Sequence, residues 1–162
     1  MRIVWGFLLL INVLIALRFY MRPDLVIATK FSWLGEVLLE MSGRQYSRYM
    51  LAMCMFPNII LVILYIYSHQ SRFFKYARFP SRNYWKKTPD LRLEALQKFQ
   101  FLFLLIGLFF NVKMLLTQMF IQKMNFARAE MPLTTIVGHH ISIVFFILLP
   151  VLFFYKTFKR PK

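Results

Sequence analysis

Four stretches of the chain are apolar over about twenty residues each, and polar or charged segments separate them. They cover about 3–20, 49–67, 99–121 and 136–155, and none of them contains Asp or Glu. A helix needs about 20 mostly apolar residues to cross the hydrocarbon core of a bilayer. The pattern therefore predicts an all-α integral membrane protein, a bundle of four transmembrane helices that forms a single membrane domain over 1–162.

The first stretch also has the character of a secretory signal peptide. A cleaved signal ends in small residues, whereas residues 18–22 here (RFYMR) are bulky and charged. We therefore expect the first stretch to be retained as a membrane anchor.

The distribution of charged residues predicts on which side of the membrane the loops and the termini lie. The 162 residues contain 21 Lys+Arg against 6 Asp+Glu, a net charge of +15, yet 59% are hydrophobic. This apolarity excludes disorder and leaves too little polar surface for a soluble nucleic-acid binder. Thirteen of the 21 cations fall in the N-terminus, the loop 68–98 and the tail after Tyr155. Because cations favour the cytoplasmic side, we expect both termini there (N-in, C-in).

The loop 68–98 is the most basic segment, and aromatic residues alternate with its cations. Pro80 argues against one continuous helix. Thr88, Pro89 and Asp90 have the character of an N-cap, a first-turn proline and a first-turn acid. We expect a helix that begins at Pro89 and continues into the third span.

Two interpretations of this loop stay open: a segment that docks on anionic lipid or an acidic partner, or a positive-inside loop whose aromatics form an interface belt. Nucleic acid is not expected as a partner, since no recognition fold accompanies the charge. The candidate contact residues of the loop are Arg72, Lys75, Arg78, Arg82, Tyr84, Trp85, Lys86 and Lys87.

The loop between the first two spans, 21–48, is expected to be partly structured. A turn is predicted at Pro23-Asp24, residues 25–31 favour a β-strand, and Gly35 interrupts the remainder of the loop. The segment is long enough to fold against the outer face of the bundle.

Two blocks carry a resemblance to a known family. The first contains Pro23, the apolar pair 26–27, Thr29-Lys30-Phe31, Gly35 and Met41-Ser42; the second is 79–85 (FPSRNYW), followed by Arg92. They resemble a bacterial family of small multi-spanning membrane proteins of unknown function, whose module also forms the N-terminal part of SdpI-type toxin-immunity proteins. The resemblance implies a multi-pass protein of the bacterial inner (cytoplasmic) membrane. Lys30 stands where that family has histidine, and the resemblance does not transfer an immunity function.

Lys113 is the most unusual residue within a span. A charge near the bilayer centre costs at least about 2.5–3.5 kcal/mol, so such a lysine is a candidate for function. It shares an i, i+4 stripe with Thr117. One interpretation is that its stem snorkels to the interface. The other is a functional contact whose partner group comes from outside the four spans: a lipid phosphate, a loop acid or an acidic residue on another subunit.

The other polar groups in the spans are expected to have structural rather than catalytic roles. Asn12, Asn58, Asn111 and Gln118 are expected to bond between helices, with a polar transport path as the alternative. Cys54, the only cysteine, has the character of an apolar packing residue.

Histidines and carboxylates give no basis for a cofactor. His139 and His140 lie about 30 Å from His69 across the bilayer, and adjacent residues point about 100° apart on a helix. We therefore expect no metal, no haem and no other cofactor. The glutathione-transferase-like membrane enzymes also have four helices, but their signature needs a Glu that no span here contains.

The leading prediction is thus a non-enzymatic accessory or assembly subunit of a larger inner-membrane complex. It has membrane lipids, anionic on the cytoplasmic side, and other membrane-protein subunits as partners. The alternative is a stand-alone immunity or sensor protein. A weaker alternative is a small transporter or lipid-handling protein.

Overall fold

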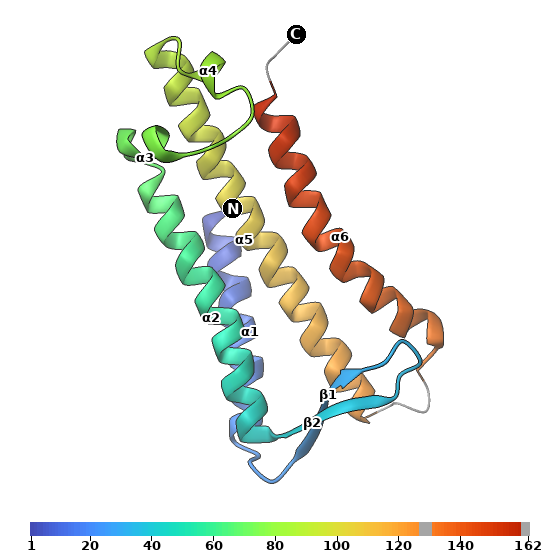
Figure 1. Ribbon diagram of the computed structural model, residues 1–162. Helices are drawn as coiled ribbons and strands as arrows, with labels where there is room; N and C mark the ends of the chain where they lie inside the picture. The colour runs from blue at the N-terminus through green and yellow to red at the C-terminus, as the bar shows by residue number, and fades with distance from the viewer. Residues whose placement is uncertain (127–130, 160–162) are drawn as a thin grey trace.

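In the computed structural model, which describes residues 1–126 and 131–159, four long helices dominate the chain (Figure 1). They are α1 (Arg2–Tyr20), α2 (Gly43–Tyr67), α5 (Pro89–Phe126) and α6 (Leu133–Phe158). Each is long and apolar enough to cross a membrane. The predicted fold class, an all-α four-helix membrane protein with a partly structured loop after the first helix, is confirmed.

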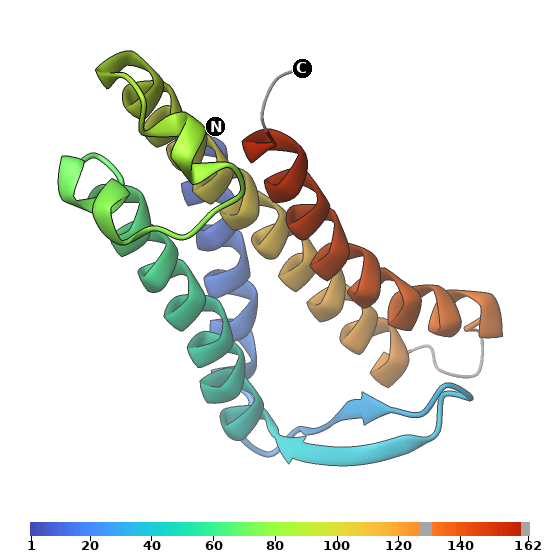
Figure 2. The same ribbon diagram turned by 45° about the horizontal axis from the view of Figure 1, so that its top comes forward.

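Four shorter elements complete the described structure. They are the strands β1 (Val26–Phe31) and β2 (Val37–Ser42) and the helices α3 (Ser71–Tyr76) and α4 (Arg82–Trp85). The N-terminus and the end of α6 lie toward the end of the bundle that carries α3 and α4, here called the terminal end, and the strands lie at the opposite, hairpin end (Figures 1 and 2). Of the cations counted for topology, Arg128, Arg160 and Lys162 lie outside the described residues.

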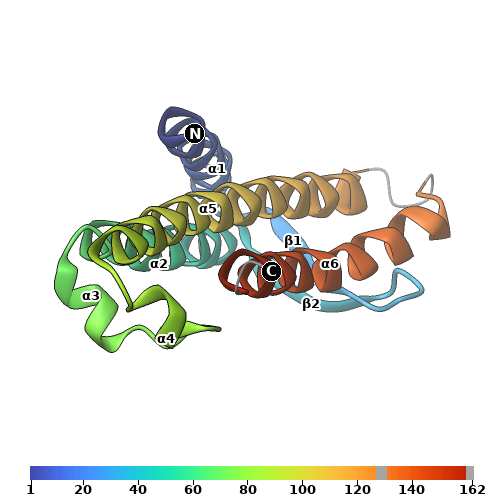
Figure 3. The ribbon, with the colours of Figure 1, turned by 90° about the horizontal axis from the view of Figure 1, so that it is seen from above.

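The long helices divide into a core and a flank. Helices α1, α2 and α5 all pack against one another, whereas α6 packs chiefly on α5. Viewed along the bundle, α1 and α6 lie on opposite sides of α5 (Figure 3). On α6, only Ile136 and Phe158 are buried among the residues described.

A network of buried amides joins the three core helices. The side-chain N–H of Asn111 donates to Asn58 Oδ1 (2.8 Å), and that of Asn12 donates to the Asn111 carbonyl (2.9 Å). Gln118 Nε2 donates to Asn12 Oδ1 (2.8 Å), and the Trp5 indole N–H donates to Asn58 Oδ1 (2.5 Å). The predicted interhelical bonding is confirmed, and α1, α2 and α5 each contribute to it.

Local sequence sets the ends of two helices. The backbone N–H of Leu91 donates to Thr88 Oγ1 (3.3 Å), so Thr88 caps a helix that begins at Pro89 and continues through the third span, as predicted. At the start of α2, Ser42 and Gln45 form a reciprocal capping box. Pro80 separates α3 from α4, which agrees with the expected break.

The segment after α1 folds into a hairpin against α5. Strands β1 and β2 pair antiparallel, and Gly35 turns the chain with φ +84°. The side chain of Asn125 accepts from the Ala28 N–H (2.8 Å) and donates to the Ala28 carbonyl (2.9 Å). This pair of bonds has the pattern that a neighbouring strand would provide, and it attaches β1 to the end of α5. The expected strand within 25–31 is confirmed.

Candidate functional site

Lys113 lies half-buried in the seam between α5 and α6. Its ammonium donates to Ser142 Oγ (2.7 Å) and to the His139 carbonyl (3.4 Å), and it lies 5.9 Å from the ring centroid of Phe146. All three groups belong to α6, so part of the coordination of Lys113 comes from within the four spans; the predicted partner group from outside the spans stays a prediction. The three groups on α6 are neutral; across residues 1–126 and 131–159, no carboxylate pairs with Lys113.

Ser142 is shared between two hydrogen bonds at this place. Its hydroxyl donates to the His139 carbonyl (2.6 Å), which leaves its lone pairs free to accept from Lys113. A groove of about 260 Å³ adjoins this group, with Ser142, His139, Leu116 and Met119 among its lining residues. The seam therefore holds a charge, a hydroxyl and an adjoining concave surface.

Thr117, the predicted neighbour of Lys113, lines a different groove. This second groove, also about 260 Å³, lies between the hairpin, α5 and α6, and Thr29, Lys30 and His140 line it with Thr117. The two residues of the predicted i, i+4 pair therefore face two different surfaces. Lys113 bonds into the seam, whereas Thr117 faces the groove beneath the hairpin.

The two histidines of α6 make structural contacts. His140 places Nδ1 2.9 Å from the Ile136 carbonyl and Nε2 3.3 Å from the Phe31 carbonyl of β1. The His139 ring stacks on Phe120, with 3.9 Å between centroids. His140 therefore connects α6 to the hairpin, as expected for an interfacial hydrogen-bonding role. The described residues hold no cluster of three His, Cys, Asp or Glu side chains suited to a metal ion.

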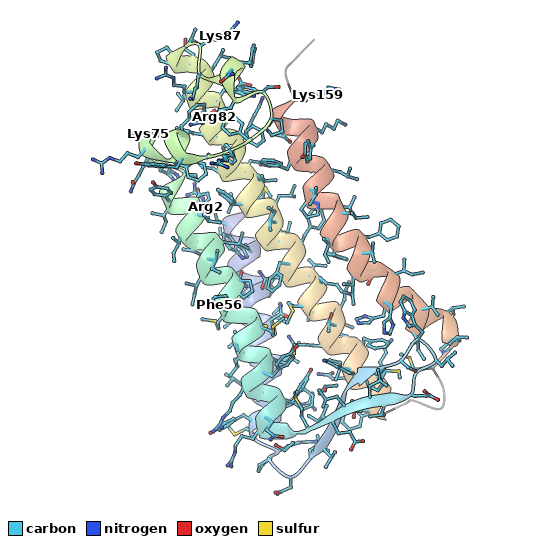
Figure 4. All side chains as sticks on the ribbon, in the orientation of Figure 1. Arg2, Phe56, Lys75, Arg82, Lys87 and Lys159 are labelled. Carbon is cyan, nitrogen blue, oxygen red and sulfur yellow. The ribbon has the colours of Figure 1, made fainter. Side chains whose placement is uncertain are left out.

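A basic pocket of about 350 Å³ forms the second candidate site, at the terminal end. It is lined by Phe74, Lys75, Arg82, Lys86, Arg92 and Leu96. Figure 4 shows Lys75, Arg82 and Lys87 gathered at this end of the bundle. Three of the predicted contact residues, Lys75, Arg82 and Lys86, are brought together here.

Two arginines build the pocket. Arg82 Nη2 donates to the carbonyls of Phe74 (3.3 Å) and Lys75, at the end of α3. Arg92 donates from Nε (3.1 Å) and Nη2 (2.9 Å) to the Lys86 carbonyl at the end of α4. The two guanidinium groups therefore hold α3 and α4 in place beside α5. Arg92 was missing from the predicted contact set; its place in the first turn of a helix that directly follows the loop was the available signal.

The remaining predicted contact residues divide by exposure. Arg72, Arg78 and Lys87 are exposed and do not line the pocket. Tyr84 is half-buried and packs edge-on against Trp85. Trp85 is only 1% exposed, its indole N–H donates to the Phe158 carbonyl (3.1 Å), and Lys98 Nζ lies 4.2 Å from its ring centroid. The prediction that Trp85 contacts lipid or a partner is therefore wrong, because its ring fastens the loop to α6.

Comparisons with known proteins add no relative to this description. The chain matches no protein-family model, and no curated protein and no solved structure gives a match. The resemblance to the family of SdpI-type proteins thus stays a prediction carried by the two sequence blocks alone.

Proposed function

We propose that this multi-pass membrane protein is a non-enzymatic accessory or assembly subunit of a larger complex in a bacterial inner membrane. The observation that carries the proposal is the Lys113 ammonium. It lies within a span and has hydrogen-bond partners on α6 but no counter-charge among the described residues.

Hydrogen bonds alone leave this charge poorly compensated. A charge removed from water is stabilised best by an opposite charge together with further hydrogen bonds. Ser142 and the His139 carbonyl supply only the hydrogen bonds. An Asp or Glu on a neighbouring transmembrane helix, placed at the depth of Lys113, would supply the missing charge.

The surroundings of Lys113 give such a helix access. The groove lined by Leu116, Met119 and Ser142 lies beside the ammonium's partner on α6. Along α6 the apolar side chains face outward, and Phe145, Ile147 and Leu152 are each more than half exposed. In a bilayer this face contacts lipid or another helix, and a helix seated over the seam would cover both the apolar face and the groove.

The test is extraction of the tagged protein in a mild detergent, followed by native mass measurement. We expect a larger assembly, and we expect Lys113→Leu to release the partner subunits because their carboxylate loses its counter-charge. The matched control is Lys156→Leu, which removes an exposed lysine near the end of α6, away from the groove, and should leave the assembly intact. A lone monomer or homodimer from the unaltered protein contradicts the proposal. Unchanged co-purification with Lys113→Leu shows that Lys113 is not the anchor.

One observation favours the alternative, a stand-alone immunity or sensor protein. The hairpin that carries Thr29 and Lys30 forms one wall of a groove of about 260 Å³ whose other walls belong to α5 and α6. A sensor would bind its ligand or toxin there. Replacement of Lys30 by alanine should then abolish protection from a membrane-active toxin while the amount of inserted protein is unchanged.

A further inference from the structure

We propose that the basic pocket at the terminal end binds the phosphate headgroup of an anionic glycerophospholipid from the adjacent leaflet. This inference goes beyond the subunit role and does not rest on it. It depends on four cations and two apolar side chains that three separate elements bring together.

The chemistry of the walls suits a phosphate ester. Lys75, Arg82, Lys86 and Arg92 line the cavity, and no acidic residue is among the described side chains that line it. Arginine presents a planar fork of donors that matches phosphate oxygens, and lysine adds a compact charge. Phe74 and Leu96 supply apolar wall, which a free inorganic anion would not use but the glycerol and first acyl carbons of a lipid would.

The two arginines are fixed before any ligand arrives. Arg82 is held by carbonyls of α3, and Arg92 by the Lys86 carbonyl. Each guanidinium has five N–H donors, so donors remain after these bonds. Arg82 Nε is buried and has no hydrogen-bond partner among the described residues. A phosphate oxygen in the pocket would provide the acceptor that this buried N–H lacks.

Depth distinguishes a lipid from a soluble anion. Helix α5 has 38 residues and is thus about 57 Å long at ~1.5 Å per residue, whereas the hydrocarbon core is about 30 Å thick. Its apolar stretch begins at Phe99, so Leu96 lies about 4.5 Å and Arg92 about 10 Å beyond that point along the axis. The headgroup layer occupies about 5–8 Å on each side of the core. Leu96 therefore lies within the headgroup layer and the Arg92 backbone just outside it, so the pocket lies at the outer edge of the layer that holds the lipid phosphates.

The experiment uses the full chain, purified in a neutral detergent and freed of lipid. Short-chain phosphatidylglycerol is titrated, and native mass measurement counts the bound lipid. Lys75→Gln with Lys86→Gln removes two pocket charges and spares both arginines that build the loop. The matched control, Arg72→Gln with Lys87→Gln, removes two charges from exposed positions of the same loop that do not line the pocket. Since each lysine near an anionic surface is worth roughly a fivefold change, we expect about 30-fold weaker binding for the pocket pair. The control pair should change binding less than about threefold.

Each other outcome overturns the proposal. Equal losses in the two pairs would mean diffuse attraction to the whole loop. Equal binding of zwitterionic phosphatidylcholine would mean that the cations are not used. If glycerol phosphate binds as tightly as the lipid, the pocket is a site for a soluble phosphate. If an acidic peptide displaces the lipid at a lower concentration than glycerol phosphate does, the pocket serves a protein partner. Failure of the subunit proposal, read from Lys113→Leu, leaves this titration unaffected because Lys113 does not line the pocket.

Discussion

The buried amides and Lys113 are polar groups within the long apolar helices, and their surroundings differ. Asn12, Asn58 and Asn111 are at most 2% exposed, and they bond to one another across three helices. Lys113 is half-buried, and its two bonds reach a hydroxyl and a carbonyl on a helix that packs chiefly on α5. The three asparagines are thus bonded within the chain, although Gln118 Oε1 of the same network is buried without a partner among the described residues. The lysine carries a charge that its two neutral acceptors compensate only in part.

This difference distinguishes a structural polar group from a candidate contact. A polar group in lipid must find a partner, and in the core the partners belong to the chain itself. The core is also tightly packed beside the amides, because Trp5 lies against Gly107. On the flank, Ser142, the hydrogen-bond partner of Lys113, lines a groove. If the distinction holds, core substitutions should lower stability and seam substitutions should act mainly on assembly.

The largest effect is expected for Asn111→Leu. The change removes two side-chain bonds to Asn58 and leaves one buried N–H of the Asn58 amide without a partner, while Asn58 Oδ1 keeps its bond from Trp5 and the other N–H its bond to the Cys54 carbonyl. Interhelical bonds in membranes average about 0.6 kcal/mol, and each stranded buried group adds about 1–3 kcal/mol. We expect a loss of about 2–4 kcal/mol in the free energy of unfolding, measured by reversible unfolding in mixed micelles. The control, Gln122→Leu near the end of the same helix, should change stability by less than about 0.5 kcal/mol. Similar values for both variants would show that the network contributes little.

A smaller loss is expected for Gly107→Ala. A Cβ at this position would come within 2.6 Å of the Trp5 indole, so the ring must shift and its bond to Asn58 is disturbed. Overpacking of this kind costs about 1–3 kcal/mol. Gly138→Ala is the matched control, because nothing lies within 4 Å of its added Cβ, and alanine is favoured over glycine in a helix by about 0.5–1 kcal/mol. The two alanines should therefore change the melting temperature in opposite directions. A Gly107→Ala protein as stable as the parent would contradict the tight core.

Local signals explain why several elements are predicted well from sequence. The spans follow from apolar length, and the start of α5 follows from Thr88 and Pro89, whose capping roles depend only on adjacent residues. The strand within 25–31 follows from its β-prone composition and the turn at Gly35. Each of these elements is set by a few consecutive side chains.

Contacts between distant elements could not be predicted in the same way. Ser142 meets Lys113 only because of the relative depth of α5 and α6, which no pattern within one helix records. Trp85 has the composition of an interface aromatic, yet it bonds to Phe158, 73 residues away, and is buried. Residue type alone identified the candidate contact residues. Tertiary packing determines which of these side chains remain accessible to a lipid or a partner.

The smallest stability effect is expected for Ser142→Ala, and it tests the comparison most directly. The change removes the hydrogen bond from the Lys113 ammonium to a neutral hydroxyl, while the His139 carbonyl still accepts from the ammonium. A single bond of this kind is worth about 0.6 kcal/mol, and the half-buried lysine can extend toward the interface. Unfolding in mixed micelles should therefore detect a loss below about 1 kcal/mol, close to that of the control Thr134→Ala, which removes an exposed hydroxyl from the same helix. A loss as large as that of Asn111→Leu would mean that the seam is a closed structural contact like the core. In that case Lys113 would have no need of a partner subunit.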